Sequence, residues 1–324
     1  ADALLTGTDN IAIGRLAFSA STDGADNIAI GRSALAVSGN DGDGNIAIGL
    51  AALGTGDVSG INNIGIGASA AAAITTGICN VAIGKSALAA ATTGCQNIAI
   101  GDLAMGAAIV TGTNNIAMGL TSLDALTGGT DNIAIGRLAA SATPDGADNI
   151  AIGRSAFAVS DGVADCNIAI GLSALGGADV SGLSNIAIGS LAMDALTTGI
   201  CNIAMGTNAL GASTTGCNNI AIGELALGAG TLACGGAGQA EGNIAIGESA
   251  LTVMTTGSNN IGIGLTSGDA LTTGTDNIAI GRLSLSASTD GADNIAIGRS
   301  SLAVSGNDGD NNVAIGLTAM GTGD

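Results

Sequence analysis

One five-residue motif, Asn-Ile-Ala-Ile-Gly or a close variant, occurs eighteen times in the 324 residues of this chain. Sixteen of the seventeen steps between successive motif asparagines are 17 or 18 residues long, and the step from Asn219 to Asn243 is 24. A fixed short period is typical of a solenoid, in which each repeat stacks on the next and buries a face that it cannot bury alone. The spacing therefore predicts about 18 stacked coils, with one enlarged coil at residues 219–242.

Positions within a coil can be counted from the motif asparagine, which we number 0. Positions +1 and +3 hold Ile, Val or Met in every coil, and position +2 holds Ala or Gly. Such alternation favours a strand with one buried face, and the Gly at position +4 marks a corner. Position +8 is mostly Leu, Met or Phe and predicts a second wall, while a Gly at position −3 in sixteen coils predicts a turn with positive φ.

These patterns predict an all-β fold: a single parallel β-solenoid, a flattened β-roll of about 18 coils of 17–18 residues, with two short strands per coil. We expect residues 1–324 to form one continuous solenoid. Residues 1–57 and 268–324 align without gaps at an offset of 267 residues, so a longer period lies over the short one and its third copy is truncated. This indicates a window on a longer repetitive protein.

The alternation raises the question of which side chains face the core. We expect the β-branched residues at +1 and +3, such as Ile135, to point inward, and the Ala and Gly residues at +2 to form a flat outer strip. The asparagines are expected to stack into a structural ladder of amide hydrogen bonds. They are Asn10, Asn27, Asn45, Asn63, Asn80, Asn97, Asn115, Asn132, Asn149, Asn167, Asn185, Asn202, Asn219, Asn243, Asn260, Asn277, Asn294 and Asn312.

The composition argues against several classes of function. The chain has no His, Trp or Tyr, so the commonest general base and metal ligand is absent. A net charge of −19 with only seven basic residues disfavours binding to a phosphate backbone. No apolar run reaches the roughly 18 residues that a membrane span needs. We therefore expect no enzyme, no cofactor, no nucleic-acid partner and no membrane span in this segment.

The motif with its following Ser-Ala-Leu and Thr-Thr-Gly resembles the head repeats of trimeric autotransporter adhesins. It is also similar to the Asn-Thr-Ala-x-Gly repeats of viral and phage tail-fibre proteins. The resemblance covers the whole chain, and it implies an extracellular β-roll, often trimeric, that presents a surface on a stalk.

Most charged residues of the motif recur at the same positions relative to the motif asparagine. The six arginines lie at +5, and in those six coils alone position −1 is Asp, which leaves two readings open: copies of one solvated block, or an interchain ladder that sets lateral register. The residues expected on an assembly face are Ala12, Ala29, Ala134, Ala151, Ala279 and Ala296, with Arg15, Arg32, Arg137, Arg154, Arg282 and Arg299, and with Asp9, Asp26, Asp131, Asp148, Asp276 and Asp293.

Six cysteines allow covalent links between coils. Cys79 and Cys95 lie 16 residues apart in consecutive coils, and Cys201 and Cys217 repeat that spacing. Equivalent positions of stacked coils lie within disulfide range, so we predict the disulfides Cys79–Cys95 and Cys201–Cys217. Free thiols and a Cys217–Cys234 pairing are alternatives, and Cys166 has no neighbour in this scheme.

The expected function is that of a structural protein: an extracellular fibre or stalk that assembles with itself, laterally or end to end, into a rigid filament. The alternatives are an adhesin or a virus or phage tail-fibre shaft that presents a binding surface, and an ice-binding solenoid. The expected location is extracellular, or the surface of a cell or virion. The Asp-Gly-rich corners at residues 39–43 and 306–310 favour plain turns, with Ca²⁺ binding as the alternative.

Overall fold

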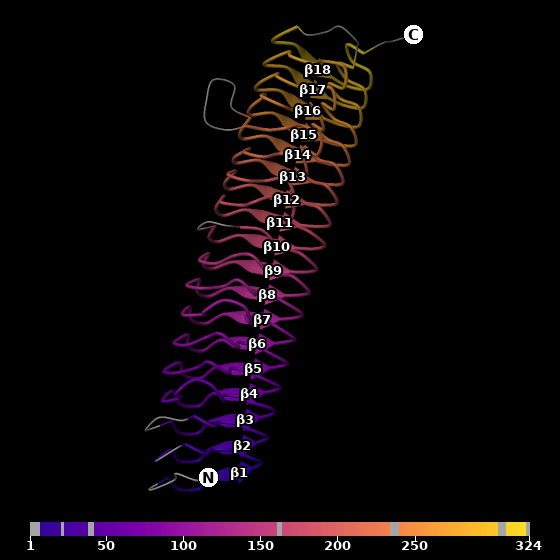
Figure 1. Ribbon diagram of the computed structural model, residues 1–324. Helices are drawn as coiled ribbons and strands as arrows, with labels where there is room; N and C mark the ends of the chain where they lie inside the picture. The colour runs from indigo at the N-terminus through magenta and orange to yellow at the C-terminus, as the bar shows by residue number, and fades with distance from the viewer. Residues whose placement is uncertain are drawn as a thin grey trace. The chain divides into compact units, whose positions relative to one another are not determined.

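The computed structural model describes residues 7–20, 23–37, 42–160, 164–233, 240–303 and 309–321. The chain forms two compact units, Ala1–Val163 and Ala164–Asp324. In the described residues the regular elements are three-residue strands, one for each motif, and the predicted parallel β-solenoid is confirmed. Within each unit the strands lie one above the next (Figure 1).

The first unit holds β1 (Ile11–Ile13), β2 (Ile28–Ile30), β3 (Ile46–Ile48), β4 (Ile64–Ile66), β5 (Val81–Ile83), β6 (Ile98–Ile100), β7 (Ile116–Met118), β8 (Ile133–Ile135) and β9 (Ile150–Ile152). The second unit holds β10 (Ile168–Ile170), β11 (Ile186–Ile188), β12 (Ile203–Met205), β13 (Ile220–Ile222), β14 (Ile244–Ile246), β15 (Ile261–Ile263), β16 (Ile278–Ile280), β17 (Ile295–Ile297) and β18 (Val313–Ile315).

Within each unit, each strand pairs in parallel with the next, and equivalent residues stand opposite one another. In the first unit Ile28 pairs with Ile46 and Ala29 with Ala47. The enlarged coil keeps this register, because Ile220 still pairs with Ile244 across the 24-residue step. Of the insertion, residues 234–239 lie outside the described residues. The added length therefore leaves the sheet undisturbed.

The burial pattern reverses the predicted orientation of the strands. Ala29, Ala134 and Ala279, all at +2, are fully buried, whereas the side chains at +1 and +3 are half-buried or exposed. The prediction that Ile135 points inward is wrong: 37% of it is exposed. The cause is the asparagine at position 0, whose amide is buried, because strict alternation then sends +2 inward and +1 and +3 outward.

The core is consequently narrow. The Ala column at +2 faces the Leu, Met and Phe residues at +8, of which Leu35 and Met105 are fully buried. A Cβ placed on Gly65, at the +2 position of β4, would lie 3.2 Å from Leu53 Cγ. The space between position +2 and the leucine wall therefore holds little more than a methyl group. This explains why the inward position of the motif is Ala or Gly.

The predicted second strand has a different backbone. Residues at +6 and +8 adopt left-handed conformations, for example Ser33 at φ 56° and Leu35 at φ 47°. They still bond from coil to coil, since Ser33 N donates to Arg15 O at 2.9 Å and Leu35 N to Ala52 O at 2.9 Å. This wall is therefore a column of stacked left-handed turns, and each coil has one regular strand.

Glycine is required at two corners for different reasons. At +4, Gly31 has φ 132°, and an added Cβ would lie 2.5 Å from Gly49 O in the next coil. At −3, the predicted positive φ is wrong: Gly94, for example, does not have a positive φ. An added Cβ on Gly94 would instead lie 2.8 Å from Gly112 O and 2.9 Å from Asn97 Nδ2. Close approach of the next coil excludes a side chain there.

Candidate assembly face

The outward side chains at +1 and +3 form two aliphatic columns, one pair per strand, which we call the aliphatic face. They are Ile throughout, except Val81, Val313, Met118 and Met205. At +3 of internal strands, Ile152 is 36% exposed and Met205 41%. At the last strand the exposure of Ile315 rises to 66%. Contiguous apolar surface of this kind marks an interaction site more often than a solvated one.

Behind this face the asparagine column is buried and bonded from coil to coil. Asn97 N donates to Asn80 Oδ1 at 3.0 Å, and Asn97 Nδ2 donates to Gly112 O at 2.9 Å in the next coil. The same pattern recurs along both units, for example where Asn260 N donates to Asn243 Oδ1 at 3.0 Å. Buried amides that bond to the neighbouring coil fix the position of the strand. The ladder thus holds the aliphatic face in regular register.

Leucines widen the apolar surface in some coils. Leu50, Leu120, Leu172 and Leu265 stand at +5, just past the strand, and are 40–44% exposed. They occupy the phase that arginine takes in other coils. One edge of the aliphatic face is therefore apolar in some coils and charged in others.

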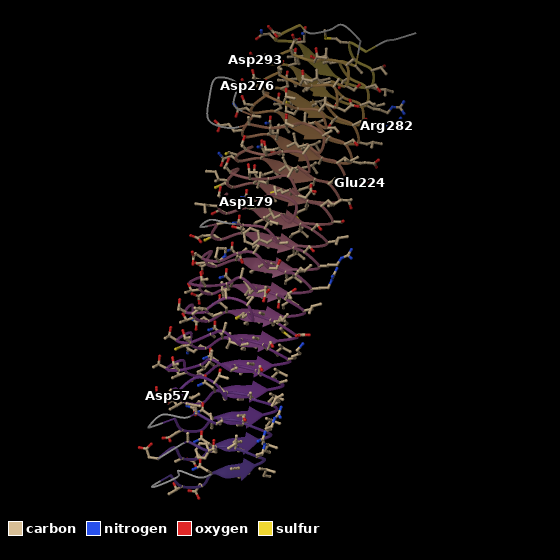
Figure 2. The ribbon with its side chains drawn as sticks, in the orientation of Figure 1. Asp57, Asp179, Glu224, Asp276, Arg282 and Asp293 are labelled. Atoms are coloured by element: carbon tan, nitrogen blue, oxygen red, sulfur yellow. The ribbon has the colours of Figure 1, made fainter. Side chains whose placement is uncertain are left out.

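The six arginines at +5 form what we call the Arg column, and the six aspartates at −1 the Asp column. All twelve side chains are exposed. In the second unit, Asp276 and Asp293 lie along one lateral edge, and Arg282 and Glu224 lie along the opposite edge (Figure 2). Strand residues separate the two edges, and position −1 lies at most roughly 20 Å from +5, the length of a fully extended segment at about 3.3 Å per residue. The columns therefore border the aliphatic face without meeting inside a coil.

The backbone explains part of the Asp column. Asp26 has φ 58°, and its counterparts Asn62 and Gly44 have φ 59° and 66°. Asp, Asn and Gly are the residues that adopt this left-handed conformation most readily. The frequent Asp, Asn and Gly at position −1 therefore indicate a residue with a left-handed backbone conformation. It does not explain why Asp, rather than Asn, accompanies Arg.

Of the alanines expected on an assembly face, the structure buries Ala29, Ala134, Ala151, Ala279 and Ala296 and exposes only Ala12, in the terminal strand β1. The predicted Ala and Gly strip is therefore wrong. The flanking Arg and Asp residues are at the surface as expected. What sequence reasoning missed is the isoleucine surface between them, because burial of the amide at position 0, which sends +1 and +3 outward, is seen only in the structure.

The predicted disulfides are not formed. Cys79, Cys95 and Cys201 are free thiols, as is Cys166. Cys79 stands at −1 with φ 58° and is exposed, whereas Cys95 stands at −2 and its Sγ donates to Thr93 O at 3.3 Å. The one-residue difference in phase turns the two side chains in different directions. The alternative Cys217–Cys234 pairing involves Cys234, which lies outside the described residues.

The Asp-Gly corners lie partly outside the described residues. Where they are described, their acidic side chains cap the neighbouring coil: Ala25 N donates to Asp43 Oδ1 at 2.7 Å, and Ala292 N donates to Asp310 Oδ1 at 2.8 Å. In the described part of the chain, no group of three or more acidic or Cys side chains is arranged to hold a metal ion. The observed contacts are those of turns.

No protein-family model matches the chain, and the comparison with curated proteins found no match. No cavity opens among the described residues. The same residues include no helix with the length and hydropathy to cross a membrane. The aliphatic face with its charged borders is therefore the candidate site of this chain.

Proposed function

We propose that this chain is a structural protein that assembles with itself through the aliphatic face into an extracellular fibre or stalk. The observation that carries the proposal is the unbroken pair of outward aliphatic columns along the strands of each unit. Leaving such a surface in water is unfavourable, at about 25 cal/mol for each Å² of apolar area that could be buried. Assembly removes that surface from water.

The face suits a second sheet better than a small ligand. β-Branched side chains at regular spacing can interdigitate with a similar surface, and stacked sheets pack about 10 Å apart. Every coil repeats the same outward pair, so a copy of the chain offers a matching surface of equal length. A structural role of this kind needs no catalytic group.

The alternatives have less support. An adhesin or tail-fibre shaft would use the same solenoid coils and add a receptor surface, and no described residue indicates such a surface. An ice-binding surface would need an outward hydroxyl array. The Thr-Thr-Gly corners do not form one, because they occur in six of the eighteen coils. The first Thr of such a corner is also engaged: Thr75 Oγ1 donates to Thr92 O at 3.1 Å and Thr255 Oγ1 to Thr272 O at 3.0 Å.

Lysines placed on the aliphatic face test the proposal. In an Ile135→Lys/Ile152→Lys variant both changes are at +3 of adjacent strands, where the side chains are 37% and 36% exposed. The fold is expected to survive, and self-association measured by sedimentation velocity is expected to fall by at least tenfold, because two charges must be desolvated at the contact.

A matched control places the same charges elsewhere. Thr76 and Thr93 are exposed at the Thr-Thr-Gly corners of adjacent coils, so Thr76→Lys/Thr93→Lys adds two lysines away from the aliphatic face. This control is expected to assemble like the parent. A monomeric parent chain, or equal assembly of both variants, would overturn the proposal.

A further inference from the structure

The two lateral edges of the aliphatic face carry opposite charge. Position +5 holds seven basic side chains and three acidic ones, Asp102, Glu224 and Glu248, so the net charge at this position is +4. At −1 there are six aspartates and no basic residue, a net of −6. The chain as a whole is strongly acidic, at −19, so a positive border on one side of the sheet is a local feature that the overall composition does not predict.

The charges are also matched coil by coil. The coils of β1, β2, β8, β9, β16 and β17 have Arg at +5 and Asp at −1. Position −1 is Asn in five coils, and in none of them is position +5 basic: it is Ala or Leu in four of them and Glu224 in the fifth. Asn satisfies the left-handed backbone as well as Asp does. The backbone therefore does not account for the choice of Asp in the coils that contain Arg.

The Arg and Asp columns distinguish between the two ways in which two copies of the sheet can pack face to face. Two identical sheets can pack face to face with aligned axes in two ways. If the solenoid axes are antiparallel, the +5 edge of one copy lies against the +5 edge of the other, and like charges meet. If the axes are parallel, strand directions oppose, and the +5 edge of one copy lies against the −1 edge of its partner. Only the parallel arrangement brings Arg to Asp.

We propose that the partner of the aliphatic face is a second copy of this chain, parallel and with each coil against the same coil. Arg282 then faces Asp276 of the partner subunit, and the other five Arg–Asp coils pair in the same way. This inference rests on the proposed function, because it concerns how copies joined by the aliphatic face are oriented. Individual surface pairs contribute little, but a repeated set of them decides orientation and register.

The first test removes the Asp column. Replacing its six aspartates by Asn keeps a residue that the left-handed position already accepts and changes the net charge from −19 to −13. A matched control replaces by Asn six other exposed or half-buried aspartates that lie at neither −1 nor +5, and it reaches the same net charge. They are Asp23, Asp57, Asp124, Asp145, Asp179 and Asp290.

General charge repulsion predicts that both variants assemble more tightly than the parent, because both are less acidic. Pairing predicts that only the control does so, and that the dissociation constant of the Asp-column variant rises about tenfold or more over that of the control, an effect of about 1.4 kcal/mol. Equal assembly of the two variants overturns the inference. The proposed function would still stand if the lysine pair on the aliphatic face blocked assembly.

The second test reads orientation directly. In a background where Cys79, Cys95, Cys166 and Cys201 are replaced by Ser, one chain carries Arg282→Cys and a second carries Asp276→Cys. A thiol-specific reagent with a spacer of about 10 Å, the distance between packed sheets, is expected to link the two chains. Position −1 holds Cys naturally in three coils, so Asp276→Cys suits the backbone.

The control mixes Arg282→Cys chains with Asp131→Cys chains, whose −1 position belongs to a different coil. Little cross-linking is expected from that pair, and the background without engineered cysteines measures any product from the remaining cysteines. An equal yield from both mixtures means that copies are not in register and overturns the inference. A parent chain that never self-associates would instead contradict the proposed function.

Discussion

Asn97 Oδ1 accepts two hydrogen bonds from one residue of the next coil: from Asn115 N at 3.0 Å and from Asn115 Nδ2 at 3.1 Å. One carbonyl oxygen thus serves both the backbone and the side chain of its neighbour. Since both residues are fully buried, neither donor can turn to water. The contact ties the position of each strand to the strand before it and is the repeating unit of the ladder.

Removing one amide from the middle of the ladder is expected to be costly. Asn97→Ala leaves Asn115 N and Gly112 O buried without their partners, and each such loss costs about 1–3 kcal/mol. We expect the free energy of unfolding to fall by about 3 kcal/mol in urea denaturation. Asn312→Ala, at the last and partly exposed strand, is the control and is expected to cost clearly less. Equal losses would contradict the ladder as described.

Adjacent residues of one strand are expected to respond in opposite ways to the same substitution. Ala134 is fully buried and Ile135 is 37% exposed. Ala134→Lys places a charge in a core with room for a methyl group and is expected to unfold the coil, at a cost of several kcal/mol. Ile135→Lys is expected to change stability by less than about 1 kcal/mol. Thermal melting of both variants at a concentration where the parent is monomeric checks the orientation of the strand.

The left-handed turn at +6 offers a test of backbone strain. Thr266 has φ 50°, and Asn208 occupies the equivalent position with φ 52°. A β-branched residue is disfavoured in this region, whereas Asn tolerates it. Thr266→Asn is expected to raise the stability by up to roughly 1 kcal/mol, and the reciprocal Asn208→Thr to lower it by a similar amount. Changes of the same sign in both variants would refute the strain argument.

Two acidic residues predict a pH effect. Burial raises the pKa of Asp194 and of Asp269 above the ordinary value of 3.8, against a smaller opposing effect of backbone hydrogen bonds. The folded state therefore holds these protons more tightly than the unfolded state does. Stability is expected to fall as the pH rises from 3.8 through the raised pKa. In an Asp194→Asn/Asp269→Asn variant this part of the pH dependence should disappear, as measured by thermal melting at pH values between about 3.5 and 7.

The free thiols are open to direct chemical measurement. Cys79 and Cys201 are exposed and unpaired, so both are expected to react with iodoacetamide in the native, unreduced protein. Peptide mapping by mass spectrometry identifies the labelled positions. Recovery of a Cys79–Cys95 or Cys201–Cys217 disulfide from that map would contradict the structure and support the disulfides between consecutive coils that the sequence spacing predicts.

Much of this protein can be predicted from its sequence by itself. The period of the motif determines the coil length and the parallel stacking, because each coil repeats the last and can only bury its core against a copy of itself. Gly at +4 determines one corner, and the large apolar residues at +8 determine one wall of the core. The phase of Arg and Asp places them at the two edges of the strand, since both positions are counted from the same asparagine.

Only the tertiary structure decided which way the strand faces. Hydropathy favours burying Ile135 over Ala134, but the sequence does not show that the opposite wall, with Leu residues held in left-handed turns, leaves space for a methyl group alone. A buried Asn amide that bonds to the next coil is lost if the strand flips, whereas an exposed isoleucine can be covered by a partner. The ladder and the narrow core outweigh the hydropathy of two residues per coil, and the aliphatic face is the consequence.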